Sequence, residues 1–246
     1  AQQQVLEGTA RQVQFFQRTH REHRQPAPRG LAQRRAQAGG GVGGRVEVGV
    51  QGVGAVAFEV EVAEHQGADA EFGGEIDYTL CDGREVRRLP GVRLGLCGRH
   101  QGANAAVALT VLEELRRLGW NLPESDVRRG LAELRWPARI EVVARRPLVV
   151  LDAAHNVASA EALVRTLDES FPARRRLLVF ATTQEKDVAG MLRLLLPFFD
   201  RVVLTRYTQN PRGVPPEELA AIAATLPSCN WEIDAAPAEA WRRVRA

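Results

Sequence analysis

The chain has 246 residues, of which 45% are hydrophobic and 26% charged, a composition typical of a folded protein with one or two domains. No apolar run approaches the roughly 20 residues that a membrane helix needs, which excludes a transmembrane protein. The formal net charge is only +3, without a basic and aromatic stripe, which argues against nucleic-acid binding. Cys81, Cys97 and Cys229 form neither a disulfide framework nor a metal-binding pair, and no secretory signal is visible, so we expect a cytoplasmic protein.

The residue counts predict that the chain is a fragment. Its only methionine is Met191, and a helical pattern is still running at the last residue. Residues 1–74 contain eleven glutamines and two leucines, whereas residues 75–246 contain three glutamines and 24 leucines. With few large apolar side chains, residues 1–75 are expected to be an atypical segment, disordered or read in the wrong frame. The alternative is that the Val, Gly and Glu alternation at 39–64 forms a real sheet.

The segment 76–137 is predicted to begin with a hairpin and to continue with two helices. Asp82-Gly83 is a favoured hairpin turn, so residues 75–88 should form two short strands, with another extended piece at 91–96. Apolar residues at helical spacing predict a helix over 104–118, which Gly119 ends. A second helix should cover residues 125–134.

From residue 138 onward, short apolar runs alternate with amphipathic helices. This order predicts the α/β class, with a mostly parallel sheet that is covered by helices on both faces. The expected strands are 139–143, 148–151, 177–181, 202–204 and 231–234, and the expected helices are 159–167, 188–196, 216–226 and 237–244. Parallel sheets bind ligands at the carboxyl ends of their strands. Here the segments after three strands are polar, namely 152–156, 182–187 and 205–210, and they mark the candidate site.

Three clusters of polar residues occur in order along the chain. They are Gly98-Arg-His-Gln-Gly-Ala-Asn104, Trp136-Pro-Ala-Arg-Ile-Glu141 and Leu151-Asp-Ala-Ala-His-Asn156. Together they resemble the folylpolyglutamate synthase/dihydrofolate synthase family of the Mur ligase superfamily. Lys186-Asp187 adds to the resemblance, which covers residues 76–246. Ala138 stands where the family motif has glycine, and Val157 where it has proline.

The resemblance implies that residues 76–137 end a central ATPase domain and that residues 138–246 form most of a Rossmann-like C-terminal domain. It also implies an ATP-dependent ligase that adds L-glutamate to a folate or dihydropteroate carboxylate through an acyl phosphate. The expected small-molecule partners are ATP, glutamate and the folate substrate, with Mg²⁺ held by ligands outside this sequence. We expect a monomer that binds neither nucleic acid nor a membrane.

By the same resemblance, the nucleotide contacts fall on Asn104 for adenine, Arg139 for the phosphates and Asp152 for the ribose or phosphate region. The implied catalytic residues are His155 and Lys186, and the implied substrate-binding residues are His155, Asn156, Ser159 and Asp187. A planar guanidinium suits a transferring phosphoryl group. Because every other basic residue is arginine, the single lysine hints at a need for a compact charge.

Each assignment has a plainer structural alternative. Asn104 could cap the helix that it begins, and Arg139 could form an ion pair with Glu141. Asp152 could have no role beyond capping a turn. His155 could be a structural histidine, and Lys186 could be a solvated loop residue. His100 is expected to hold a turn.

The sequence contains no P-loop, because its only lysine is followed by Asp187 rather than by serine or threonine. We therefore expect this chain to be inactive as a ligase on its own. Two alternative functions stay open: another Mur-type enzyme, such as a UDP-N-acetylmuramoyl amino-acid ligase, and a non-catalytic nucleotide-binding fragment.

Overall fold

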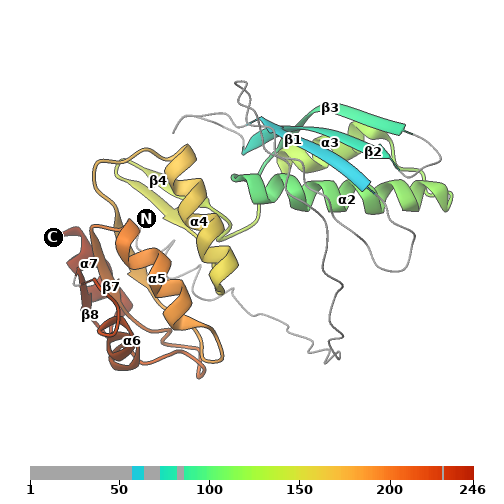
Figure 1. Ribbon diagram of the computed structural model, residues 1–246. Helices are drawn as coiled ribbons and strands as arrows, with labels where there is room; N and C mark the ends of the chain where they lie inside the picture. Colours follow the sequence, from blue (N-terminus) through green and yellow to red (C-terminus); the bar gives the residue numbers. More distant parts are fainter. Residues whose placement is uncertain (1–56, 64–72, 82–85, 229) are drawn as a thin grey trace, which may run out of the picture. The chain divides into compact units, whose positions relative to one another are not determined.

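The computed structural model describes residues 57–63, 73–81, 86–228 and 230–246 (Figure 1). Most of the segment 1–75, including the greater part of the strand-like stretch at 39–64, lies outside these ranges. The turn predicted at Asp82-Gly83 also lies outside them. Among the described residues, no helix combines the length and apolar character required to cross a bilayer.

The first described part is an antiparallel sheet of three strands, β1 (Ala57–Ala63), β2 (Gly74–Cys81) and β3 (Val86–Leu94). The predicted hairpin is confirmed, since β2 and β3 pair from Cys81 opposite Val86 to Gly74 opposite Leu94. Residues 91–94 continue β3, so the expectation of a separate extended piece at 91–96 was wrong. The register shifts between Ile76 and Tyr78, and Asp77 Oδ1 accepts the Gly91 N–H at 2.7 Å, which lets β3 run on through Pro90-Gly91.

Two helices follow, α2 (Arg99–Arg117) and α3 (Glu124–Glu133). Alternate residues of β2 and β3 form a buried cluster with Ala105, Ala106 and Leu109 of α2. This alternation is the period of a strand with one buried face. Glu113 is almost fully buried on α2 and is ion-paired with Arg87 at 2.9 Å and with Arg116. Its charge is therefore compensated from two sides.

The second part begins with an antiparallel hairpin, β4 (Glu141–Arg145) and β5 (Leu148–Leu151). Only Arg146-Pro147 connects these strands, and a two-residue connection permits only an antiparallel pair. The parallel sheet consists of β6 (Leu177–Phe180), β7 (Arg201–Leu204) and β8 (Trp231–Ile233), in that order. The helices of this part are α4 (Val157–Ser170), α5 (Val188–Phe198), α6 (Pro216–Ala223) and α7 (Pro237–Arg245).

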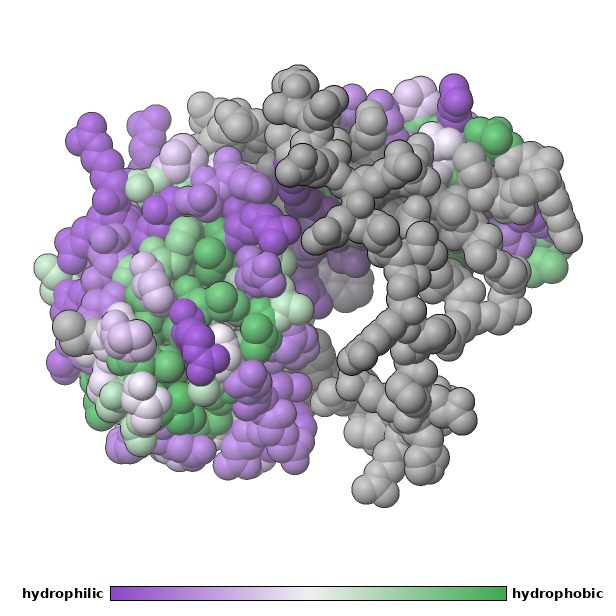
Figure 2. Space-filling model, in the orientation of Figure 1, coloured by the Kyte–Doolittle hydropathy of each residue, from purple (hydrophilic) through white to green (hydrophobic). Residues whose placement is uncertain are grey.

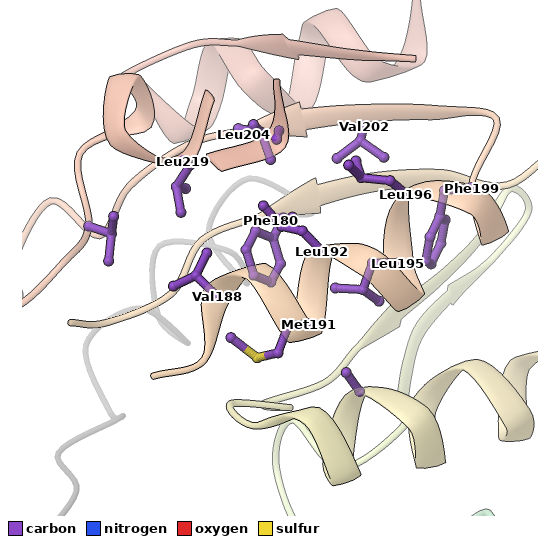
Figure 3. Packing of buried hydrophobic residues seen from close by; sticks show 13 residues of the cluster. Phe180, Val188, Met191, Leu192, Leu195, Leu196, Phe199, Val202, Leu204 and Leu219 are labelled. Carbon is purple, nitrogen blue, oxygen red and sulfur yellow. The ribbon is translucent and has the colours of Figure 1, made fainter. Parts of the chain in front are cut away.

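Helices cover both faces of the parallel sheet, as the sequence pattern predicted. Figure 3 shows Phe180, Val202 and Leu204 among the leucines of α5 and Leu219 of α6. Val203 points to the opposite face and packs against Ala240 and Val244 of α7. Because neighbouring residues of β7 are buried on opposite faces, its apolar run is continuous rather than alternating. Apolar surface also remains over α5 on the outside of this part (Figure 2).

Candidate functional site

Residues that follow β5, β6 and β7 line one cavity, but β5 belongs to the antiparallel hairpin and not, as the sequence predicted, to the parallel sheet. Asp152 and Ala154 follow β5, Ala181 follows β6, and Thr205 and Tyr207 follow β7, and all five line one cavity of about 190 Å³. Thr205 donates its N–H to the Phe180 oxygen at 2.8 Å, which joins the last two of these strand ends. The predicted polar segment 182–187 contributes no residue to the lining of this cavity.

Two of these cavity residues were not singled out from the sequence. Thr205 is 2% exposed, and within the described part of the chain its hydroxyl oxygen has no hydrogen-bond partner. The Tyr207 hydroxyl donates to the Ala181 oxygen at 3.3 Å, and burial raises its pKa. The signal available in the sequence was their position directly after an apolar strand.

Arg139 lies on a strained turn between α3 and β4. Ala138 and Ile140 on either side of it have positive φ angles of 54° and 50°, a conformation that is rare for alanine and exceptional for a β-branched residue. Such strain persists only where surrounding contacts hold it. Here Ala138 donates its N–H to Glu141 Oε2 at 2.8 Å, and the Ala138 oxygen accepts the Ala153 N–H at 2.8 Å.

Asp152 braces the same turn from the end of β5. Its Oδ2 accepts the Ile140 N–H at 2.9 Å, and its Oδ1 accepts the Ala154 N–H at 2.7 Å. Burial raises the pKa of Asp152, although these two N–H groups and the charges of Arg139 and His100 act to lower it. Asp152 thus stabilises a turn, which was the structural alternative to nucleotide binding. Each carboxylate oxygen keeps a second lone pair that a ligand could use.

The guanidinium of Arg139 has no hydrogen bond or ion pair assigned within the described ranges. Glu141, which the sequence suggested as an ion-pair partner of Arg139, instead accepts a hydrogen bond from the Ala138 N–H. Arg139 is half-buried on a turn whose backbone is fixed from both sides.

Asn156 and Ser159 form a capping box at the start of α4. Asn156 Oδ1 accepts the Ser159 N–H at 2.8 Å, and Ser159 Oγ accepts the N–H groups of His155 and Asn156 at 3.0 and 3.1 Å. The Ser159 hydroxyl also donates to the Asn156 oxygen at 3.0 Å. The polar groups of this pair are thus largely used to hold the His155 backbone in place.

The His155 ring is held by its own loop. Its Nδ1 lies 3.1 Å from the Ala153 oxygen, and since a carbonyl only accepts, Nδ1 carries the hydrogen.

Lys186 and Asp187 lie in the loop that leads into α5. Asp187 is the N-cap, and its Oδ1 accepts the Gly190 N–H at 2.7 Å. Glu185 has a φ of 67°, so the residue before Lys186 is also strained. Lys186 is half-buried, and within the described residues no ion pair is assigned to its ammonium group.

Asn104 is exposed on α2, which begins at Arg99. The suggestion that Asn104 caps this helix was wrong, because the helix begins five residues earlier and its N-cap is Gly98. Its Nδ2 donates to Gln101 Oε1 at 3.1 Å. Across the described ranges, no group of three or more His, Cys, Asp or Glu side chains could hold a metal ion.

Comparison with known proteins finds relatives of the C-terminal part of the chain. Residues 138–246 match the family described as Mur ligase, glutamate ligase domain. The chain is 36% identical over 181 residues to the dihydrofolate synthase/folylpolyglutamate synthase of Mycobacterium tuberculosis, a match that covers 68% of this chain and 37% of that protein.

Solved structures agree with this relationship. The folylpolyglutamate synthase of M. tuberculosis complexed with ADP has a TM-score of 0.61 at 32% identity, covering 72% of this chain and 40% of that one. E. coli FolC in complex with DHPP and ADP has a TM-score of 0.59 at 26% identity, covering 76% and 39%. The chain spans less than half the length of these relatives. Both the resemblance and the fold class expected from the sequence are thereby confirmed.

We predict that Ala138→Gly stabilises the protein. A β-carbon in the left-handed conformation costs about 1–2 kcal/mol, and the extra freedom of unfolded glycine offsets about 0.5–1 kcal/mol of the gain. The free energy of unfolding, measured by urea titration, should rise by about 0.5–1 kcal/mol. The matched control is Ala221→Gly on the exposed side of α6, which should lower it by up to about 1 kcal/mol. A loss of stability at both positions would show that residue 138 is not left-handed.

We predict that Asp152→Ala destabilises the fold by about 1–3 kcal/mol, because it leaves the Ile140 and Ala154 N–H groups without their acceptor. The control is Asp168→Ala, which removes the same charge from a side chain that is 68% exposed and should change stability by less than about 0.5 kcal/mol. Equal unfolding midpoints for the two variants would contradict the bracing role of Asp152.

Proposed function

We propose that this chain, whose residues 138–246 have the fold of the Mur ligase C-terminal domain, is part of an ATP-dependent ligase that joins L-glutamate to a folate or dihydropteroate carboxylate. The observation that carries the proposal is the braced turn that presents Arg139 next to Asp152. Relatives at 26–32% identity were solved with ADP bound, which supports a nucleotide ligand for the proposed function.

The proposed reaction has two steps. The folate carboxylate attacks the γ-phosphorus of ATP, giving an acyl phosphate and ADP. The amino nitrogen of glutamate then attacks the acyl carbon, inorganic phosphate leaves, and the nitrogen loses a proton as the amide forms. Phosphoryl transfer depends mostly on positioning and on neutralising charge, so the protein must supply fixed cations and hydrogen-bond donors.

We assign the nucleotide to Arg139, Asp152 and Asn104. The Arg139 fork would hold phosphate oxygens in a bidentate manner, with no need to reorganise its turn. Asp152 would accept a ribose hydroxyl with its remaining lone pairs, and Asn104 would contact the base.

We assign the glutamate side to His155 and Lys186. His155, whose ring is held by the Ala153 oxygen, would take the proton that the attacking amine loses, and Lys186 would attract a glutamate carboxylate as a compact charge. Asn156, Ser159 and Asp187 were expected to bind substrate. Their side chains cap α4 and α5, so we propose that they act by positioning His155 and Lys186.

Mg²⁺ would neutralise the phosphate oxygens, but the described residues contain no cluster fitted to hold it. We therefore assign no step of this chain to the metal. The cysteines are odd in number and far apart in the sequence, which is consistent with a reducing compartment. We therefore propose that the protein is cytoplasmic. We further propose that the chain works as a monomer on small molecules, without nucleic acid or membrane partners.

Two measurements on the purified chain test this function. The sequence lacks a P-loop, so we expect no glutamate-dependent phosphate release from ATP. Calorimetric titration should nevertheless detect ADP binding, and Arg139→Lys should weaken it about tenfold, because the planar fork is lost while the charge stays. Arg193→Lys on the exposed side of α5 is the control and should leave the affinity unchanged. Ligation by the chain alone, or equal affinities for both variants, would contradict the assignment.

A further inference from the structure

The first turns of α4 and α5 lie against each other. Gly190 is buried in the first turn of α5, where an added β-carbon would come within 2.6 Å of Cγ2 of Val157, the first residue of α4. Val157 also packs against the buried cluster that contains Met191, and Figure 3 shows Met191 pointing from α5 toward the pale yellow helix α4. The side chains at a contact decide how closely two helices approach, so the absence of a side chain at Gly190 permits this contact.

His155 and Lys186 occupy equivalent positions next to the contact. Each lies directly before the N-cap residue of its helix, which is Asn156 for α4 and Asp187 for α5. Asp187 is in turn tied to the contact, because its Oδ1 accepts the Gly190 N–H at 2.7 Å. The spacing of the two helix starts therefore determines the spacing of the two residues that precede them.

A side chain at position 190 would push the two helix starts apart. Carbon atoms in ordinary contact are about 3.5–4.0 Å apart, so the added β-carbon would require a shift of about 1 Å. Val157 cannot readily turn Cγ2 away, because a β-branched side chain in a helix has one strongly preferred rotamer. The Asp187 carboxylate, with Oδ2 at 2.4 Å from the added β-carbon, is the free end of its side chain and moves more easily. The family motif has proline in place of Val157, so the branched methyl group is a feature of this chain.

We propose that Gly190 is a positioning residue that sets the spacing between His155 and Lys186 by letting Val157 lie against α5. This inference rests on the proposed function, in which these two residues serve the glutamate side of the site. Groups that bind or react with a substrate must be held within about 0.5 Å of their productive geometry. A shift of about 1 Å at the helix starts exceeds that tolerance. Gly190 thus acts on the substrate only through the two helix starts.

The first test measures the contact without a ligand. In the unmodified chain, a nuclear Overhauser effect should connect the Val157 methyl protons with the Gly190 α-protons. Alanine is normally more favourable than glycine in a helix, but Gly190→Ala should lower the urea midpoint of unfolding because it crowds Val157. The matched control is Gly130→Ala on α3, where an added β-carbon meets nothing within 4 Å, and its midpoint should rise.

Val157→Ala should relieve the crowding, since it deletes Cγ2. In the Val157→Ala background, Gly190→Ala should lower the midpoint less than it does alone, which is the coupling expected of two residues in contact. The backbone amide shifts of residues 152–156 should likewise respond less to Gly190→Ala in that background. Additive effects on the midpoint, or a missing Overhauser effect in the unmodified chain, would overturn the proposal.

The second test is a calorimetric titration with L-glutamate. Gly190→Ala should weaken the affinity about tenfold, and adding Val157→Ala should restore most of the loss. Gly130→Ala should leave the affinity unchanged. If Gly190 had only a structural role, Gly190→Ala would lower the unfolding midpoint but bind glutamate as tightly as the unmodified chain, and this result would overturn the positioning role.

The two tests distinguish this inference from the proposed function. An unmodified chain that binds no glutamate would contradict the assignment of His155 and Lys186, and the positioning role would be overturned with it. A chain that binds glutamate equally well with and without Gly190→Ala would keep that assignment and overturn only the role of Gly190.

Discussion

The two hydrogen bonds that the Asp152 carboxylate accepts hold the candidate site together. They tie the strained residue before β4 to the turn after β5, segments that are twelve residues apart in the sequence. This brace maintains the left-handed conformation of Ile140, and the hydrogen bonds of Ala138 to Glu141 and Ala153 maintain that of Ala138. The orientation of Arg139 depends on that backbone, and so does any contact that its guanidinium makes with an anion.

The rest of the site follows the same design, in which side chains near the ligand position also stabilise the local backbone. Asn156, Ser159 and Asp187 cap the helices after β5 and β6, and this fixes the loops that carry His155 and Lys186. The start of α5 lies at the carboxyl edge of the parallel sheet, the edge at which such sheets bind ligands, whereas α4 follows the antiparallel hairpin. The structural and functional interpretations of these residues are therefore complementary.

The sequence predicted the elements of the parallel sheet because apolar runs and helical periodicity are local signals. The start of α2 was predicted five residues too late, since Arg99–Ala103 contains few of the large apolar residues that mark a helical face. The strained turn could not be predicted from periodicity, although Ala138 at a glycine position of the family motif hinted at it. The φ of 54° at Ala138 explains why the family motif has glycine at this position, because glycine adopts a positive φ without steric cost. The hydrogen bonds of Asp152 and Gln101 depend on side-chain geometry that no spacing rule supplies.

The central claim is that Arg139, the loop 152–156 and Asn104 form one nucleotide site. Backbone and side-chain amide chemical shifts of the isotope-labelled chain, followed during an ADP titration, test it most directly. The account predicts saturable changes at Arg139, in residues 152–156 and at the Asn104 side-chain amide. Changes confined to the separate hollow at Ala224, Leu226 and Trp231, or no saturable change at Arg139 and Asp152, would contradict it.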